Sequence, residues 1–141
     1  MRALVLVEPG QIELQQRPDP QPGPGEVLLK VEATTLCGTD LRIISGAKTA
    51  GVRPGVIMGH EIAGRIAAVG DGVSGYHVGQ QATPSIVLSC NHCRVCLLGL
   101  EHLCENLRLI GYDIDGGLAD YCLLPAQAVA QGNLITTRTE V

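Results

Sequence analysis

Residues 90–104 read Cys-Asn-His-Cys-Arg-Val-Cys-Leu-Leu-Gly-Leu-Glu-His-Leu-Cys, which spaces four cysteines as C-x2-C-x2-C-x7-C. A two-residue gap lets the chain turn back so that two sulfurs reach one ion, and Zn²⁺ takes four ligands in a tetrahedron. The four sulfurs would fill this shell and leave no position for water or substrate. The spacing therefore predicts a firmly bound structural zinc in a lobe over about residues 89–107, with these ligands: Cys90, Cys93, Cys96 and Cys104.

Other uses of the four cysteines are weaker. A bacterial iron–sulfur motif has three residues before its last cysteine and a proline after it, whereas here the gap is seven and Glu105 follows. Two disulfides would suit a secreted protein, but the apolar start of the chain is too short for a signal peptide. His92 and His102 could replace a cysteine, yet four cysteines complete the shell, so both histidines are expected on the surface.

Outward from the lobe, the chain reads as short strands. The 18 Gly and 8 Pro among 141 residues leave no room for a long helix. Strands are expected at 1–7, 11–16, 26–35, 61–69, 78–84 and 118–124, with a short helix at 38–45. This pattern predicts a mainly β barrel or sandwich with an aliphatic core, because the chain has no Phe and no Trp. Residues 131–141 are polar and are expected to be a frayed end.

Composition limits the classes of partner. The formal net charge is -4, from 10 Lys+Arg against 14 Asp+Glu, which disfavours binding to nucleic acid. No apolar stretch is long enough to span a bilayer, so no membrane partner is expected. A cytoplasmic location is the default, and there six cysteines indicate metal binding or catalysis rather than disulfides. Cys122, in an apolar strand, is expected to be a buried thiol. The oligomeric state is left open.

Cys37 and His60 form a second candidate metal site. Cys37 lies where a strand gives way to the helix, and His60 follows Gly59 just before the strand at 61–69. Each has an ordinary structural explanation, because a lone Cys at a strand end is usually a small buried residue and a lone His after Gly is usually a turn residue. Neighbouring side chains that could serve such a site favour the metal interpretation: Thr39, Asp40 and Glu61.

A resemblance strengthens this second site. Gly59-His60-Glu61-x2-Gly64-x5-Gly70-x2-Val73 resembles the zinc signature of the medium-chain zinc-dependent alcohol dehydrogenases. Cys37-Gly38-Thr39-Asp40 resembles that family's first catalytic-zinc motif, and the four-cysteine stretch resembles its structural-zinc lobe. The motifs occur in the family's order over about residues 1–129. The Cys-Gly-Thr-Asp form is similar to the polyol, threonine and secondary-alcohol branches.

The resemblance implies a fold, a chemistry and a role for each residue. The fold would be a GroES-like, partly open β-barrel with a few short helices. Cys37 and His60 would hold a catalytic zinc with Glu61 behind it, Asp40 would hydrogen-bond His60, and Thr39 would pass on the proton of the substrate hydroxyl. Zinc would lower the pKa of an alcohol or polyol so that hydride can pass to NAD(P).

The sequence also departs from the family's pattern. Arg42 stands where some members have a relay histidine. The third catalytic-zinc ligand and the nucleotide-binding domain would lie beyond Val141, so NAD(P) is expected only in a full-length enzyme. In this chain the catalytic zinc should then be weakly held and the domain inactive. The alternative is a free-standing GroES-like zinc-binding module without redox activity, and the gene sequence beyond residue 141 would decide between the two.

One glycine motif is expected to mislead. Residues 70–75 fit G-x-G-x-x-G, the fingerprint of a dinucleotide site. Such a site also needs a helix opening at the turn and an acid about 20 residues later. No helix start comes next in the sequence, and no acidic residue lies between Gly75 and Glu101. The stretch is expected to be a turn between two strands, with His77 on the surface.

Overall fold

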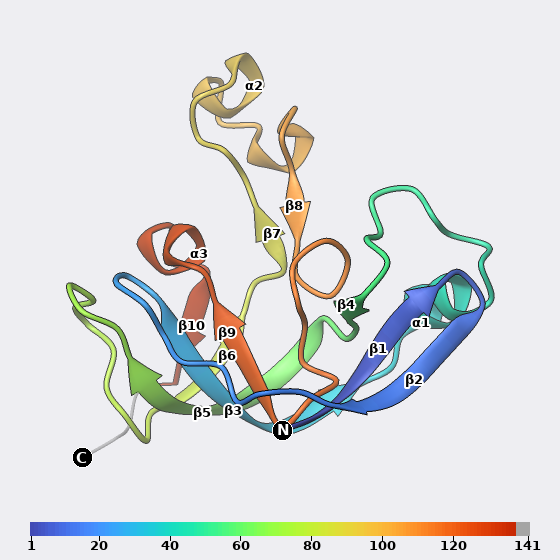
Figure 1. Cartoon of the computed structure of the whole chain (residues 1–141). Coiled ribbons are helices and arrows are strands. Elements are labelled where there is room, and N and C mark those ends of the chain that lie inside the picture. The colour runs from blue at the N-terminus through green and yellow to red at the C-terminus, as the bar shows by residue number, and fades with distance from the viewer. Residues whose placement is uncertain (138–141) are drawn as a thin grey trace.

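The computed structural model describes residues 1–137, which form three antiparallel sheets, short helices and a projecting lobe (Figure 1). The strands are β1 (Arg2–Glu8), β2 (Gln11–Gln16), β3 (Val27–Thr35), β4 (Val56–Ile57), β5 (Glu61–Val69), β6 (Gln81–Pro84), β7 (Val87–Leu88), β8 (Arg108–Leu109), β9 (Tyr121–Leu124) and β10 (Leu134–Thr136). The helices are α1 (Gly38–Ile44), α2 (Arg94–Leu97), α3 (Ala126–Ala130) and the 3-10 turn η1 (Glu101–Leu103).

The two larger sheets do not close into a complete barrel. One has the order β10-β6-β5-β3-β9 and the other the order β2-β1-β4. The third sheet is the pair β7–β8, and α2 stands away from the other sheets at the far end of this pair (Figure 1). The expected mainly β, partly open architecture with few short helices is confirmed.

The core is aliphatic, as expected. Strand β5 alternates exposed and buried side chains along its first six residues, which gives it one face toward the core and one toward solvent. Ile62 and Ile66 on that inner face pack with Val27 and Leu29 of β3 and with Leu124 of β9. Because the core ties β3 firmly to β5, the ends of these strands have fixed positions, and the second candidate site lies there.

Most expected elements are present, and the strand at 78–84 needs a correction. Strand β6 begins only at Gln81, because Gly79 has φ +88 in a turn closed by the bond from Gln80 N to His77 O at 3.1 Å. The strand at 118–124 is likewise shorter, since β9 begins at Tyr121. The turn expected after β5 is confirmed, and His77 is exposed.

The frayed end expected over residues 131–141 is wrong for its described part. Leu134–Thr136 form β10, which pairs with β6, and Leu134 is only 3% exposed. The Asn133 side-chain amide donates to Val87 O at 2.7 Å, and Gln131 Nε2 donates to Ser89 O. These polar side chains hold the segment to the β7–β8 pair, which forms the stalk of the lobe. Residues 138–141 lie outside the described residues.

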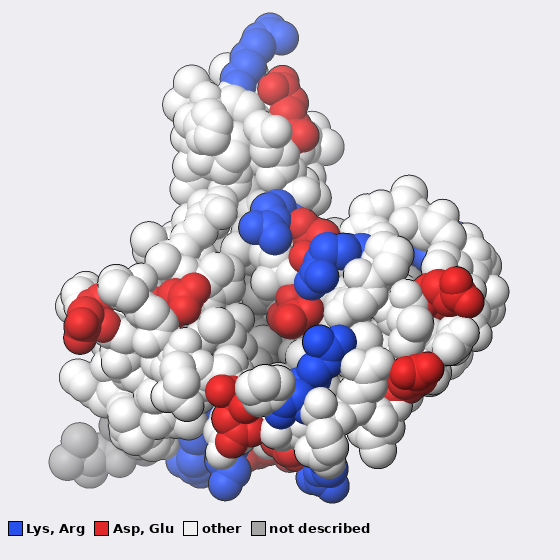
Figure 2. Space-filling view, viewed as in Figure 1, with Lys and Arg blue, Asp and Glu red and all other residues white. Residues whose placement is uncertain are grey.

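Charged side chains of both signs are interspersed on the face drawn in Figure 2. Several pairs are ion pairs, including Arg2 with Asp120 at 2.8 Å and Arg65 with Glu32 at 2.9 Å. Within residues 1–137, no helix has the length and apolar character needed to cross a membrane.

Cys122 is confirmed as a buried thiol, with 1% of its surface exposed. Burial, with a smaller contribution from the Asp115 carboxylate, raises the pKa of Cys122 to about 12. Because the thiolate is the nucleophile, we expect iodoacetamide at pH 8 to leave Cys122 unmodified in the folded, chelator-treated chain while Cys37 and Cys90 react. Peptide mass spectrometry with and without denaturant checks this. Equal labelling of Cys122 and Cys37 under native conditions would contradict it.

Candidate metal centres

The four lobe cysteines converge on one point. Cys90 precedes the α2 turn, Cys93 is its N-cap residue and Cys96 lies within it, while Cys104 directly follows η1. The Sγ atoms of Cys93 and Cys96 are 3.4 Å apart, and the Cys93–Cys104 and Cys90–Cys96 pairs are 4.0 Å apart. A tetrahedron with zinc–sulfur bonds of about 2.3 Å has edges of about 3.8 Å. The sulfurs therefore fit a four-thiolate zinc site.

Backbone amides in the lobe point at the sulfurs and favour their ionised form. Cys93 N donates to Cys90 Sγ at 3.3 Å, and both Cys90 N and Asn106 N donate to Cys104 Sγ. The amide of His92 is the main reason that the pKa of Cys90 falls to about 6, whereas burial raises the pKa of Cys96 to about 12. Four thiolates this close repel one another unless a cation lies between them.

The geometry supports neither a disulfide nor a histidine ligand in the lobe. Sulfur separations of 3.4 Å and more are well beyond the roughly 2.05 Å of a disulfide bond. His92 and His102 are exposed, as expected, and His92 Nδ1 contacts the Cys90 carbonyl at 2.7 Å. The described His, Cys, Asp and Glu residues that meet in this cluster are the four cysteines alone.

Strand pairing explains why Cys37 and His60 meet although 23 positions separate them. Thr35 at the end of β3 pairs with Glu61 at the start of β5. Cys37 lies two residues beyond that pair on one strand, and His60 lies one residue before it on the other. Gly59 supplies the turn into His60 with φ +90, a backbone conformation that favours glycine.

The donor atoms of the second candidate site are close together. Cys37 Sγ lies 3.1 Å from His60 Nε2, and the donor atoms of Cys37, His60 and Glu61 all lie within 4.8 Å of one another. Zinc bonds of about 2.3 Å to sulfur and about 2.0 Å to nitrogen imply a sulfur–nitrogen separation near 3.5 Å. A sulfur, an imidazole and a carboxylate at this spacing suit zinc.

The N-terminus of α1 fixes Cys37. Its sulfur accepts from Thr39 N at 3.2 Å, and Asp40 Oδ2 accepts from Cys37 N at 2.9 Å, which together form a capping box. The other carboxylate oxygen of the fully buried Asp40 faces His60 Nδ1 at 3.5 Å. This contact is too long for a good hydrogen bond, and neither atom has another partner among the described residues. A small shift of the imidazole would complete the bond that orients a metal-binding histidine.

Glu61 differs from the other two donors because it is exposed. The Thr35 hydroxyl donates to Glu61 Oε2, so the carboxylate is already held beside His60. A pocket of about 410 Å³ opens against His60 and Glu61, with Thr34, Thr35 and Thr83 on its walls. The pocket leaves this end of the β3–β5 pair open to solvent.

The structure also reveals a residue of this site that no motif indicated. Tyr112 is 6% exposed, and its ring centroid lies 5.2 Å from that of His60 at an interplanar angle of 42°. Burial raises the pKa of Tyr112, and the Thr39 side chain partly offsets that shift. Tyr112 is distant in sequence from the other site residues. The sequence feature that could have indicated it is the group of glycines around it, Gly111, Gly116 and Gly117.

Comparison with known proteins points to one class. The family model described as alcohol dehydrogenase GroES-like domain matches residues 23–133. The L-threonine 3-dehydrogenase of Xanthomonas euvesicatoria pv. vesicatoria is 45% identical over 129 residues, which cover 89% of this chain. Those residues are 38% of the relative, so the chain spans well under half the length of the curated relatives it matches.

Solved structures give the same result. A thermostable alcohol dehydrogenase from Pyrobaculum aerophilum, solved with cobalt and zinc bound, is 35% identical with a TM-score of 0.83, covering 99% of this chain and 42% of that one. An Escherichia coli alcohol dehydrogenase solved with NADH is 33% identical with a TM-score of 0.86, covering 100% of this chain and 39% of that one.

Proposed function

This chain belongs to the medium-chain zinc-dependent alcohol dehydrogenase family through its GroES-like domain, and from that premise we propose that residues 1–129 are the zinc-binding catalytic domain of an alcohol or polyol dehydrogenase. The observation that carries the proposal is the meeting of Cys37, His60 and Glu61 beside an open pocket. A sulfur, a nitrogen and an exposed carboxylate leave room for a substrate oxygen, which a closed four-thiolate site does not.

Each residue of this site has a task in the proposed reaction. Cys37 and His60 would hold the metal, and Asp40 would orient the imidazole through Nδ1. Glu61 would either be a third ligand of the metal or lie behind it. The hydroxyl of Thr39 would relay the proton of the substrate alcohol, giving up its own proton to a solvent water as it takes that of the substrate. When bound, zinc would act as a Lewis acid that lowers the pKa of the substrate hydroxyl, which favours hydride transfer to a nicotinamide. NADH in the Escherichia coli relative supports the choice of cofactor class.

The two centres have separate tasks in this proposal. The four lobe cysteines would fill the coordination shell of a zinc, and most of them are buried. A zinc there therefore stabilises residues 89–107 and takes no part in the reaction. A four-thiolate site needs reduced cysteines, which favours a reducing compartment, the cytoplasm. Small alcohols and polyols are the proposed substrates, since the relatives are named for threonine and alcohols.

A chimera tests the proposed function. Residues 1–137, which include β10, would replace the matching part of the L-threonine 3-dehydrogenase of Xanthomonas euvesicatoria, and NAD(P)H formation with alcohols and L-threonine would be followed by its near-ultraviolet absorbance. We expect zinc-dependent turnover that Cys37→Ala or His60→Ala reduces to background, while Cys122→Ala retains it. The isolated chain should not turn over, because the named strands within residues 1–137 pair only antiparallel and form no parallel β-α-β unit of the kind that binds a dinucleotide.

Two results would contradict the proposal. A chimera that folds and binds zinc at both centres but forms no NAD(P)H would favour a zinc-binding module without redox activity. Turnover by the isolated 141 residues would show that this chain holds a nucleotide by itself, with the turn at residues 70–75 as the first place to look for the site.

A further inference from the structure

The loop of residues 110–118, between β8 and β9, is bonded to the segment that ends at His60. Gly116 N donates to Ile57 O at 2.8 Å, Gly117 N to Gly59 O at 2.9 Å, and Leu118 N to Met58 O at 2.8 Å. These bonds reach the three residues that immediately precede His60. The position of the backbone that leads to His60 is therefore set by this loop as much as by β4 or β5.

The fit between the two segments depends on glycine. A Cβ atom on Gly116 would lie 2.0 Å from Gly59 O, and one on Gly111 would lie 2.6 Å from the same oxygen. Side-chain atoms never approach a carbonyl oxygen so closely, and the neighbouring atoms here are backbone, which cannot rotate away. The carbonyl of Gly59 is thus enclosed by two glycines of the loop.

Tyr112 extends the contact from the backbone to the imidazole itself. Its buried ring packs at a tilt against His60, and Lys48 Nζ lies 5.6 Å from the ring centroid on the same tyrosine. Aromatic pairs with centroids about 4.5–7 Å apart attract each other beyond the effect of their burial. This contact favours one orientation of the His60 ring, whose Nδ1 has no firm hydrogen bond.

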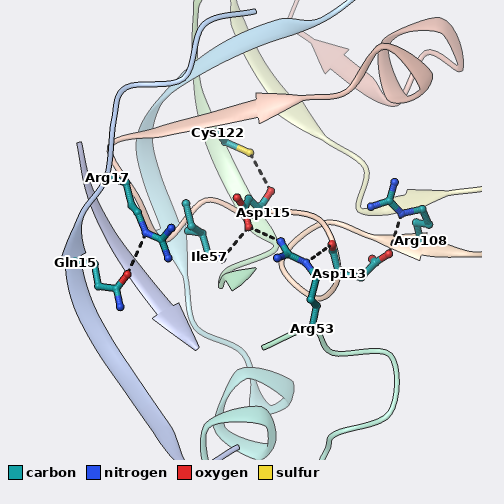
Figure 3. Close-up of polar contacts among 8 residues, drawn as sticks. All are labelled: Gln15, Arg17, Arg53, Ile57, Arg108, Asp113, Asp115 and Cys122. Atoms are coloured by element: carbon teal, nitrogen blue, oxygen red, sulfur yellow. Dashed lines mark hydrogen bonds and ion pairs between the residues drawn. The ribbon is translucent and has the colours of Figure 1, made fainter. Parts of the chain in front are cut away.

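Two aspartates fasten the loop to its surroundings (Figure 3). Asp115 Oδ1 accepts from Arg53 Nη2 at 3.0 Å and from Ile57 N at 3.1 Å, while Asp113 accepts from Arg108 Nε at 2.9 Å and from Leu109 N at 2.7 Å. Exposed ion pairs contribute little, so the bonds to the two part-buried amides matter more. The bond to Leu109 N anchors the loop at the end of β8, away from His60. The bond to Ile57 N is a further link to the segment that leads to His60.

We propose that the 110–118 loop sets the orientation of His60 toward Cys37, and that Tyr112 is the positioning residue through which it acts. The inference rests on the proposed function only in taking His60 as a metal ligand. The competing explanation is that the loop stabilises the fold and has no separate effect on His60. The two explanations differ in what a change at Tyr112 does to the two metal centres.

The test uses the 141-residue chain with zinc in the lobe, titrated with Co²⁺. Cobalt bound by Cys37 and His60 gives sulfur-to-metal charge-transfer and d–d absorption. We expect Tyr112→Leu to weaken Co²⁺ binding at that site by about 10–100-fold, the range for residues that orient a metal ligand, and to alter the d–d bands. Tyr112→Phe, which keeps the ring, should bind as the parent does. Lobe zinc should remain at one per chain in both variants.

A pair of glycine variants separates positioning from general stability. Gly116→Ala and Gly70→Ala each place a Cβ about 2 Å from a backbone carbonyl oxygen, Gly59 O in one case and Gly23 O in the other. Both should lower the thermal midpoint, but only Gly116→Ala should change the cobalt spectrum. Equal spectral effects, or a Tyr112→Leu variant that binds Co²⁺ as the parent does, would overturn the proposal.

Nuclear magnetic resonance of the chain with zinc in the lobe alone gives a readout that needs no metal at Cys37. Cross-relaxation between His60 ring protons and Cys37 Hβ should persist in Tyr112→Phe and disappear in Tyr112→Leu. If the parent binds no Co²⁺ at this site but shows these contacts, the positioning role stands, and the chimera decides the proposed function separately. If the contacts persist in Tyr112→Leu, the positioning role fails whatever the metal does.

Discussion

Replacing Cys90 with serine is expected to remove zinc from the lobe and to unfold residues 89–107 locally while the sheets stay folded. The lobe has almost no apolar interior of its own, since its buried cluster consists of Cys93, Cys96 and Cys104 with Cys90 and Val95 packed against them. Its leucines point outward: Leu97 is 74% exposed, Leu98 65% and Leu103 58%. Structural zinc contributes about 10–16 kcal/mol of apparent binding free energy in small zinc domains, and without it the lobe has little to fold around.

Zinc content per chain and hydrogen exchange of the amides of residues 94–103 measure this effect. We expect the content of Cys90→Ser to fall by one zinc and those amides to lose protection, while amides of β3 and β5 keep theirs. His92→Ala and His102→Ala are the matched controls, because both histidines are exposed beside the cysteines and should leave the zinc in place. A Cys90→Ser chain that keeps its lobe zinc, or a histidine variant that loses it, would contradict the four-thiolate assignment.

The lobe could be predicted from sequence because its information is local. Four cysteines within fifteen residues can reach one ion by short turns alone, and the four sulfurs meet as expected. Strands β3 and β5 were also predictable, since each is nine residues long with enough apolar positions to be read as a strand. The lobe's stalk was not, because β7 and β8 are two residues each and carry no readable period.

The second centre shows where sequence reasoning needs help. Cys37 and His60 are ordinary residues until the pairing of Thr35 with Glu61 brings them together, and the residues alone left that pairing open. The resemblance to a family supplied the joint metal site, and the structure supplied the pairing. The sequence does not indicate Tyr112, because its role depends on the 110–118 loop. Three backbone hydrogen bonds hold that loop against residues 57–59. The sequence does not indicate strand β10, because its segment is polar and has no clear period. The side-chain amides that donate to the stalk hold this segment in place.

The two centres should differ strongly in zinc affinity when a chelator competes for the metal. The lobe offers four thiolates, three of them buried, and excludes water. The second site offers one sulfur, one nitrogen and Glu61, whose carboxylate is exposed and already bonded to Thr35. Each ligand that is missing, or that is already hydrogen-bonded to another residue, weakens zinc binding by several kcal/mol. A factor of ten in affinity corresponds to about 1.4 kcal/mol. We expect the lobe to bind zinc about 1,000-fold more tightly or better.

A colorimetric chelator of graded concentration measures the two affinities in one titration of the zinc-loaded chain. One zinc should leave at low chelator concentration, and the second should leave only at much higher concentration or after unfolding. His60→Ala should abolish the first phase alone, and Cys104→Ser the second alone, which assigns each phase to its site. If His60→Ala instead removes the tighter zinc, the lobe is not the structural centre, and the saturated cysteine shell does not explain the stability of the domain.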